Sequence, residues 1–561
     1  MNEKKICFIT CVNDSVLYSE CLKYINNLKI PEGFQVEKIA ISSANSITSA
    51  YNKAMKDSDA KYKVYLHQDV FIINNNFIED VANVFESDEK IGIIGMTGAK
   101  TIPTTAKWWE AFQRSGGVYE NHAGIMKPLL FDETKKNHEK VKALDGFLLV
   151  TDKDIPWRED IFTGWHFYDM SQCVEFTLKG YNVVVPWQEK PWCIHDCGFV
   201  ETTGNYDKYR SAFLDEYSKR IFPQVSIMIT AYNRPEYFKL ALESAINQSY
   251  KNVEIIVCDN STNNYVKKVC AKYLQNYNIK YYKNEVELEV IDNFNKAISL
   301  ANSEYLCFLM DDDLYNKDKL KVMMNYFIQK PELSLVTSHR QTIDEHGNYL
   351  KPIFETQTLF EKKTYIDEKY MKALFLNTGK NFIGETTTPI FKKSNLTCNK
   401  FGIYENKSYS VISDIVTWIS MSEKGAVLYV PETLSYFRIH KEQDQKRMVT
   451  IYNGVNELVS FSTVLFEEQY IDYSKKQNKT YYNLLLKLMD TLNTLCKDDK
   501  ILESFLKNNI VSGLLNSYRK LLFYIKDSNE LKDISIKNNY DEIITKISKN
   551  HALDVEVKKN Y

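Results

Sequence analysis

The chain has 561 residues, of which 44% are hydrophobic and 26% are charged, and its formal net charge is −2 at pH 7. This length exceeds what one hydrophobic core supports, so we expect about three domains. The balanced charge argues against a nucleic-acid partner, and no apolar stretch approaches the roughly 20 residues that cross a bilayer.

The first half alternates short apolar runs with helix-period segments, which is typical of a mostly parallel α/β sheet. Strands are expected at residues 6–9, 36–41 and 62–66. The apolar part of the first run is too short for a signal peptide, which favours a strand there. Together with the eleven scattered cysteines, expected to be buried free thiols, this favours a cytoplasmic protein.

The second half repeats this alternation, with strands expected at 225–229, 253–257 and 305–309 and a helix at 236–248. We therefore predict domains at 1–222 and 223–447. From 448 to 561 the pattern is helical throughout, with an apolar stripe at helical spacing that includes Leu485, Leu488, Met489 and Leu492. The stripe favours a helical cap on the preceding domain, and it leaves a membrane-surface or partner-docking role, including self-association, open.

Polar residues keep their spacing between the two halves. Asn52 and Asp69 are 17 positions apart, as are Asn295 and Asp312. Asp169 and His195 are 26 positions apart, as are Asp414 and His440. The offset between the halves is 243 for the first pair and 245 for the second. We interpret this as one site that was built twice.

Three carboxylates in a row, Asp311 to Asp313, end the strand expected at 305–309. Such a cluster is costly next to a buried strand unless a cation or a solvated ligand neutralises it. Hard oxygen ligands suit Mg²⁺ or Mn²⁺, which usually complete their shell with phosphate oxygens. A solvated acidic turn is the alternative reading of the triplet alone.

The surroundings of this triplet resemble the family 2 inverting nucleotide-sugar glycosyltransferases of the GT-A fold. The resemblance rests on SIMITAYNR at 226–234, on VEIIVCDNS at 253–261 and on MDDD at 310–313, where Met310 takes the place of the first acid. It implies that Asp312 binds the metal and that Asp311 contacts the ribose. It also implies donor contacts from three further residues, Thr230, Asn233 and Asp259.

Two later motifs continue the resemblance, SDIVTW at 413–418 and FRIH at 437–440. The first implies that Asp414 is the catalytic base, which activates an acceptor hydroxyl by taking its proton. The second implies that His440 contacts the metal or the diphosphate, although a packed core histidine is the alternative. By the same resemblance, residues 385–389 line the acceptor side.

The first half resembles a divergent group of GT-A glycosyltransferases that carry HQDV at this strand end, here at 67–70. DGF at 145–147, GWHFYD at 164–169 and IHDCG at 194–198 also resemble that group. The resemblance implies metal ligation by Asp69 and His195 and catalysis by Asp169. His67 would be a second imidazole ligand or a phosphate contact. Donor contacts are expected from Thr10 and Asn52.

Two features set the first half apart. ISSAN at 41–45 offers no acid where the second half has Asp259, so its nucleotide is held by hydroxyls, amides or backbone. Cys193 and Cys197 flank His195, but this spacing without further paired cysteines is weak evidence of zinc.

The sequence thus predicts an α/β protein with two tandem GT-A domains and an all-helical C-terminal region. Each domain is expected to move one sugar from a nucleotide-diphosphate donor to a glycan or glycoprotein acceptor with inversion, using Mn²⁺ or Mg²⁺. The function expected is bacterial surface-glycan or protein glycosylation. Two rivals remain: catalysis by the second domain only, with a glycan-binding or scaffolding first domain, and a non-enzymatic nucleotide-sugar-binding protein.

Overall fold

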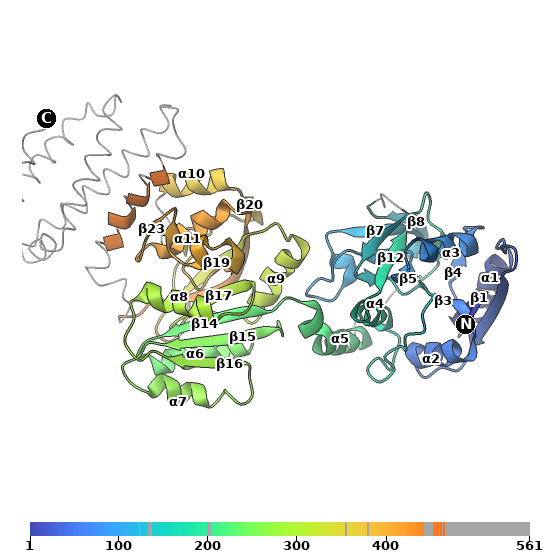
Figure 1. The fold of residues 1–561 in the computed structure, drawn as a ribbon, viewed down its shortest axis with the longest axis horizontal. Coiled ribbons are helices and arrows are strands. Elements are labelled where there is room, and N and C mark those ends of the chain that lie inside the picture. The colour runs from blue at the N-terminus through green and yellow to red at the C-terminus, as the bar shows by residue number, and fades with distance from the viewer. Residues whose placement is uncertain are drawn as a thin grey trace, which may run out of the picture. The chain divides into compact units, whose positions relative to one another are not determined.

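The computed structural model describes residues 1–441, with gaps at 123, 133–136, 199–203, 354–355 and 379–380. It also describes ten of the residues between 453 and 465. The described residues belong to two compact units (Figure 1). The first contains Met1–Pro223, with Ser249–Asn252 and Leu320–Pro331, and the second contains the other described residues. Nearly all of the region 448–561, including the apolar stripe predicted there, lies outside the described residues.

The first unit is built on a seven-stranded sheet in the order β2-β1-β3-β11-β5-β12-β9. β1 runs parallel to both of its neighbours, whereas β11 runs antiparallel to β3 and β5. The sheet is therefore mixed, and the predicted parallel order holds for its first three strands. The strands are β1 (Asn2–Cys11), β2 (Gln35–Ile41), β3 (Ala60–His67), β5 (Ile91–Gly95), β9 (His138–Val141), β11 (Leu148–Thr151) and β12 (Asn182–Pro186).

Both faces of this sheet are covered, because alternate residues of β1 belong to different cores. Ile6 and Phe8 pack in one apolar cluster, and Cys7 and Ile9 pack in another. Strand residues alternate between faces, so a strand that is buried on both sides reads as a continuous apolar run. The helices of this unit are α1 (Ser15–Asn26), α2 (Ile47–Asp57), α3 (Phe77–Ser87), α4 (Tyr168–Leu178) and α5 (Asn205–Ile221).

A second, smaller sheet of the first unit has the order β10-β6-β7-β13-β4, with β8 paired to β7. It matters for the site because it brings the end of β13 beside the segment that follows β3. Its strands are β4 (Val70–Ile72), β6 (Thr97–Ala99), β7 (Arg114–His122), β8 (Ile125–Leu130), β10 (Ala143–Leu144) and β13 (Cys193–His195).

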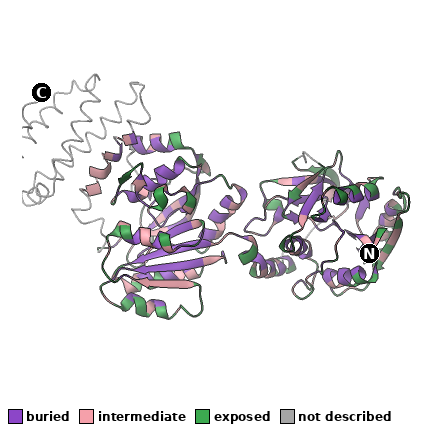
Figure 2. Cartoon of the chain, viewed as in Figure 1, coloured by how far each residue is buried: buried purple, intermediate pink, exposed green. Residues whose placement is uncertain are grey.

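The second unit has a nine-stranded sheet in the order β16-β15-β14-β17-β21-β19-β24-β18, with β20 paired to β24. Its first four strands are parallel. Among them β14, β15 and β17 are mostly buried, whereas every residue of the edge strand β16 is half-buried, and Figure 2 draws buried residues in purple and half-buried ones in pink. The strands are β14 (Val225–Ala231), β15 (Val253–Asp259), β16 (Ile279–Lys283), β17 (Tyr305–Met310), β18 (Leu314–Tyr315), β19 (Leu335–Ile343), β20 (Thr364–Ile366), β21 (Ile390–Lys392) and β24 (Val427–Arg438).

Helices flank these strands, and the apolar faces of α8, α10 and α11 share one core with the sheet, as Phe308 of β17 and Trp418 of α11 show. The helices of this unit are α6 (Pro235–Ile246), α7 (Tyr265–Ala271), α8 (Val290–Leu300), α10 (Glu368–Thr378) and α11 (Ser413–Ser422). All of α9 (Lys319–Gln329) except Lys319 belongs to the first unit. Within the described residues, no helix combines the length and the apolar character that crossing a membrane requires.

The repeat predicted from spacing is visible in the order of the elements. Asn52 and Asn295 are the sixth residues of α2 and α8, and each of these helices leads into a central strand, β3 or β17. Asp69 and Asp312 each lie two residues beyond the end of that strand. The constant spacing therefore reflects the same helix, strand and turn in both units.

Candidate active sites

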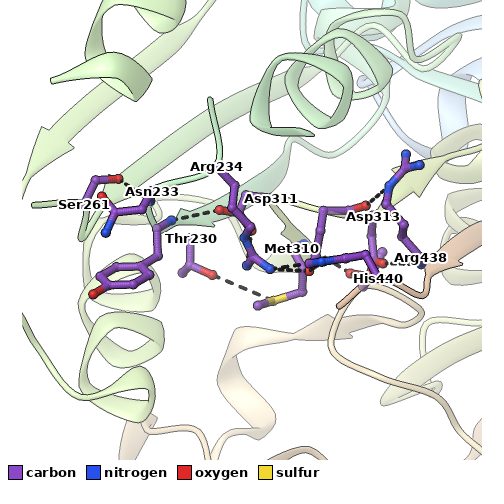
Figure 3. Close-up of polar contacts among 12 residues, drawn as sticks. Thr230, Asn233, Arg234, Ser261, Met310, Asp311, Asp313, Arg438 and His440 are labelled. Carbon is purple, nitrogen blue, oxygen red and sulfur yellow. Dashed lines mark hydrogen bonds and ion pairs between the residues drawn. The ribbon is translucent and has the colours of Figure 1, made fainter. Parts of the chain in front are cut away.

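The carboxylate triplet of the second unit follows β17 and is held by specific partners (Figure 3). The buried Asp311 accepts the backbone N–H of Tyr232 at 2.8 Å and pairs with the guanidinium of Arg234 at 2.5 Å. Burial raises the pKa of Asp311 to about 7, although Arg234 acts in the opposite direction. This side chain therefore fixes the loop after β14 to the end of β17.

Asp312 lies between an arginine and a histidine. Its Oδ2 is 2.6 Å from Nη1 of Arg234 and 3.0 Å from Nε2 of His440. Burial alone would raise the pKa of Asp312, but His440 and Arg234 outweigh it and hold that pKa below its usual value. The structure thus brings together Asp312 and His440, the two predicted metal ligands of this unit, and adds Arg234, which the sequence reading missed.

Asp313 has a supporting role. It accepts the Thr387 hydroxyl at 2.6 Å and the backbone N–H of Arg438 at 3.0 Å, and burial raises its pKa well above the usual value. The Nε of Arg438 in turn donates to the carbonyl of Asp312 at 2.7 Å. These contacts tie β24 to the triplet, which explains how a histidine 128 positions from Asp312 reaches it.

The predicted nucleoside contacts lie at the ends of β14 and β15. Asp259 is fully buried and accepts the Ser261 N–H at 2.8 Å and the Tyr281 hydroxyl at 2.6 Å. Lys283 lies 3.2 Å from the same carboxylate. Tyr281 and Lys283 come from β16, and no sequence motif pointed to them.

Asn233 has a left-handed backbone with φ of 55°, which asparagine tolerates better than most residues. Its N–H donates to the Ser261 hydroxyl at 2.8 Å, and its side-chain oxygen accepts the Thr262 N–H at 3.0 Å. Asn233 therefore joins the two loops of the donor region. The Thr230 hydroxyl lies 3.8 Å from the sulfur of Met310, the residue at the place of the missing acid.

Asp414 is the second residue of α11. Its carboxylate accepts the Ile415 N–H at 2.8 Å and the side-chain amide of Asn381 at 2.7 Å. Burial raises the pKa of Asp414 to about 7, and the carboxylate of Glu385 adds to this shift. Glu385 also raises the pKa of Asp313, so the triplet and Asp414 have a common charged neighbour. Asn381 is a contact that the sequence reading missed.

In the first unit, His67, Asp69 and His195 form a group whose ligand atoms all lie within 4.8 Å of one another. Nε2 of His195 is 3.8 Å from Oδ1 of Asp69. β13 pairs with β4 and places His195 opposite Val70, next to Asp69 in the chain. Imidazole nitrogen and carboxylate oxygen are a donor set that suits Mn²⁺, so these residues fit the predicted cation.

A second group shares the same histidine: Glu120, His195 and Cys197 also have ligand atoms within 4.8 Å of one another. β7 runs parallel to β13 with Glu120 opposite His195. Sequence spacing singled out Cys197 but gave no signal for Glu120, which lies in β7, 75 positions before His195.

A cavity of about 360 Å³ opens beside Asp69 in the first unit. Its lining comes mainly from the carboxyl ends of β1, β2 and β3, with Trp165 from a later loop. Ser42 and Ser43 supply hydroxyls to this lining, whereas Asp69 is its one carboxylate. A larger cavity, about 600 Å³, is lined by other residues of this unit and contains no predicted site residue.

Thr10 and Asn52, the two predicted donor contacts of the first half, are not in the lining of the smaller cavity. Thr10 is buried within β1. Asn52 is buried in α2, where its amide donates to the Trp157 carbonyl at 2.9 Å and accepts the Trp157 N–H at 2.8 Å. Both bonds join the Asn52 side chain to the backbone of Trp157, so Asn52 holds this part of the chain against α2.

Asp169 is the second residue of α4 and accepts the Met170 N–H at 2.8 Å. Burial raises its pKa to about 6. The preceding Tyr168 connects it to the ligand group, because the Tyr168 hydroxyl lies 2.6 Å from Nε2 of His67 and donates to the Gly146 carbonyl at 3.0 Å. Burial and the nearby Asp169 also raise the pKa of Asp145 to about 7.

Comparison with known proteins identifies both units. Residues 7–217 match the family model described as "Glycosyltransferase like family", and residues 226–391 match "Glycosyl transferase family 2". The chain thus carries two tandem glycosyltransferase domains, as the sequence predicted, and the α/β fold class is confirmed.

Relatives by sequence include three bacterial or archaeal proteins. Protein CgeD of Bacillus subtilis is 31% identical over 140 residues, which are 23% of this chain and 33% of CgeD. An uncharacterized glycosyltransferase of Haemophilus influenzae is 23% identical over 56% of this chain and 93% of its own length. The uncharacterized glycosyltransferase MJ1057 of Methanocaldococcus jannaschii is 32% identical over 27% of this chain and 53% of its own length.

Solved structures are more distant. The S. aureus TarS fragment 1–349 in complex with UDP-GlcNAc is 14% identical, with a TM-score of 0.36 over 53% of this chain and 90% of that one. The mannosyltransferase PcManGT from Pyrobaculum calidifontis, in complex with GDP-Man and Mn²⁺, is 14% identical, with a TM-score of 0.34 over 59% of this chain and 88% of that one. Similarity at this level assigns no residue roles.

Proposed function

We propose that both domains are catalytic, and that each transfers a sugar from a nucleotide-diphosphate donor to an acceptor hydroxyl with inversion. The observation that supports this best is the repeated pairing of an Asp–His group with a helix-start aspartate. In the first domain these are Asp69 with His195 and the aspartate Asp169. In the second they are Asp312 with His440 and the aspartate Asp414.

The two helix-start aspartates are proposed as the catalytic bases. A hydroxyl is a poor nucleophile until a carboxylate takes its proton, and a base works best when its pKa lies near the working pH. The pKa of Asp414 is raised to about 7 and that of Asp169 to about 6, in both cases chiefly by burial. One proposed base in each site, which acts directly on the acceptor hydroxyl, gives a single displacement and therefore inversion at the anomeric carbon.

A divalent cation, Mn²⁺ or Mg²⁺, is proposed to bind in each domain and to offset the charge that develops on the departing diphosphate. In the first domain His67, Asp69 and His195 would hold it. In the second domain Asp312 and His440 are the proposed ligands, and the guanidinium of Arg234 contacts both of them.

The acceptor is proposed to be a growing glycan, free or attached to a protein, of the bacterial surface. Two sites on one chain most simply serve successive steps, because an acceptor held by one domain sees the other at high effective concentration. The two nucleotides are expected to differ, since Asp259 has no acidic counterpart among residues 41–45.

The rival proposal keeps catalysis in the second domain and makes the first a glycan-binding or scaffolding module. The missing acid at 41–45 favours it, and the grouping of His67, Asp69 and His195 disfavours it, because a structural module has no need of such a donor set.

A donor panel decides between the two proposals. Wild type, Asp69→Ala and Asp312→Ala would be incubated with UDP-, GDP- and dTDP-sugars and Mn²⁺, and release of nucleoside diphosphate would be measured. Two active domains predict that each variant loses turnover of a different donor. If Asp69→Ala loses nothing while Asp312→Ala loses all turnover, the rival is correct. Asp57→Asn and Asp292→Asn, at exposed aspartates of α2 and α8, serve as controls.

A further inference from the structure

Arg234 lies where a cation of the second domain would bind. Its Nη1 is 2.6 Å from Oδ2 of Asp312 and 3.4 Å from Nε2 of His440, while these two predicted ligands are 3.0 Å apart. Its Nη2 is 2.5 Å from Asp311 (Figure 3). The guanidinium therefore contacts both proposed metal ligands and the neighbouring carboxylate.

The positive charge of Arg234 compensates the negative charges of Asp311 and Asp312. The side chain of Asp311 is fully buried, and that of Asp312 is only 11% exposed. Two adjacent buried carboxylates are strongly unfavourable unless a cation compensates them. Because Arg234 contacts the ligand atoms themselves, it and a divalent cation compete for Asp312 and His440.

The first domain has no arginine at the position that corresponds to Arg234. β1 and β14 end at Cys11 and Ala231, so the residue at the position of Arg234 is Asp14, three residues beyond the strand. Asp14 caps α1 by accepting the N–H groups of Val16 and Leu17. The neutral Gln68 stands where the second domain has Asp311, and it likewise accepts backbone N–H groups, those of Asn13 and Asp14.

We propose that Arg234 is an exchanging ligand that couples cation binding to donor binding in the second domain. Without donor it neutralises Asp311 and Asp312. When a nucleoside diphosphate binds, the guanidinium moves to its phosphate oxygens, which its planar fork suits well, and Asp312 and His440 become available to the divalent cation. The first domain, with no arginine at this position, binds its cation without nucleotide.

This inference rests on the proposed function, and Mn²⁺ binding tests it without any turnover. The measurement uses full-length chain that carries Asp69→Ala and His195→Ala, so that only the second site remains. Free Mn²⁺ is followed by electron paramagnetic resonance with and without UDP, GDP or dTDP. We expect Mn²⁺ binding to tighten at least about tenfold with the nucleotide that binds, a typical coupling between two ligands.

Replacing Arg234 should weaken the coupling. In the same background, Arg234→Gln is expected to bind Mn²⁺ more tightly without nucleotide than its parent does, so that the effect of nucleotide becomes smaller and only direct ligation of Mn²⁺ by the phosphate oxygens remains. Arg234→Lys keeps the charge but loses the fork, and it should retain part of the coupling if the Gln variant fails to fold. Arg220→Gln, at an arginine with a 53% exposed side chain, is the matched control and should behave like its parent.

Two results would overturn the inference. The first is equal Mn²⁺ affinity with and without nucleotide in the parent. The second is unchanged coupling in folded Arg234→Gln, or full coupling in Arg234→Lys where the Gln variant does not fold. If none of the three nucleotides binds even with Mn²⁺, the proposed function of this domain fails, and the inference fails with it. Nucleotide binding measured separately by calorimetry distinguishes the two failures.

Discussion

Asp169 and Asp414 occupy the same place in two different helices. Each is the second residue of its helix, and each accepts the N–H of the next residue at 2.8 Å. A helix N-terminus favours the charged form of a carboxyl. In both cases, however, burial has the larger effect and raises the pKa. Both carboxyls are therefore poised to exchange a proton near neutral pH.

Removing either carboxylate should strongly slow transfer by its own domain. Asp414→Asn keeps the size of the side chain and can still be reached by the Ile415 N–H, so we expect an intact fold. Loss of a general base typically lowers kcat by about 10²–10⁴-fold. The assay is transfer by the second domain, with Asp292→Asn as control. Unchanged kcat in the folded variant would reassign the base.

The pH dependence of the two domains should differ. A base acts as a carboxylate, so each rate rises as pH increases through the pKa of its base and falls below it. The pKa is about 7 for Asp414 and about 6 for Asp169. Near pH 6.5 (roughly midway), the first domain should retain more of its maximal rate than the second. Asp414→Asn and Asp169→Asn isolate the two profiles, and superimposable profiles would contradict the prediction.

Periodicity and spacing predicted the class of fold and the tandem order, and the resemblance to family 2 glycosyltransferases implied that His440 and Asp312 belong to one site. These features are accessible because a strand and the turn after it leave a local pattern, and because a duplicated unit keeps its spacing. Arg234 stood inside a motif, yet its contact with Asp312 depends on how the loop after β14 folds back. Glu120 reaches its site because β7 pairs with β13, and Asn381 because its side chain bonds Asp414 in a later helix. Contacts between segments that are distant in the sequence leave no local pattern, so both residues were missed.

The repeated asparagines show the opposite case, where a true repeat does not identify a function. Asn52 and Asn295 were found from their spacing, and donor binding was expected of Asn52. In the structure Asn52 bonds the backbone of Trp157, and the side chain of Asn295 accepts the backbone N–H of Phe401 at 2.8 Å. A constant position in a duplicated fold is also what a structural support requires.

Asn52→Ala should therefore lower stability rather than donor affinity. Both the N–H and the carbonyl of Trp157 would lose a buried partner, and leaving two such groups unsatisfied costs about 2–6 kcal/mol in total. Asn295→Ala removes one such bond and should cost about 1–3 kcal/mol. Urea unfolding checks both values, with Asn26→Ala, at an exposed residue that ends α1, as control. A stable Asn52→Ala variant with weakened donor binding would restore the donor role.

The two domains should differ in their Mn²⁺ affinity when no nucleotide is present. Without nucleotide we expect about one Mn²⁺ per chain, because His67, Asp69 and His195 are grouped while Arg234 contacts the ligands of the second site. Altering an outer-shell partner alone typically weakens metal binding about 10–100-fold, so His195→Ala should weaken it about 100-fold or more. His346→Ala, at a histidine with a 76% exposed side chain, is the control. Two equal Mn²⁺ sites in nucleotide-free wild type, or full affinity in His195→Ala, would contradict this assignment.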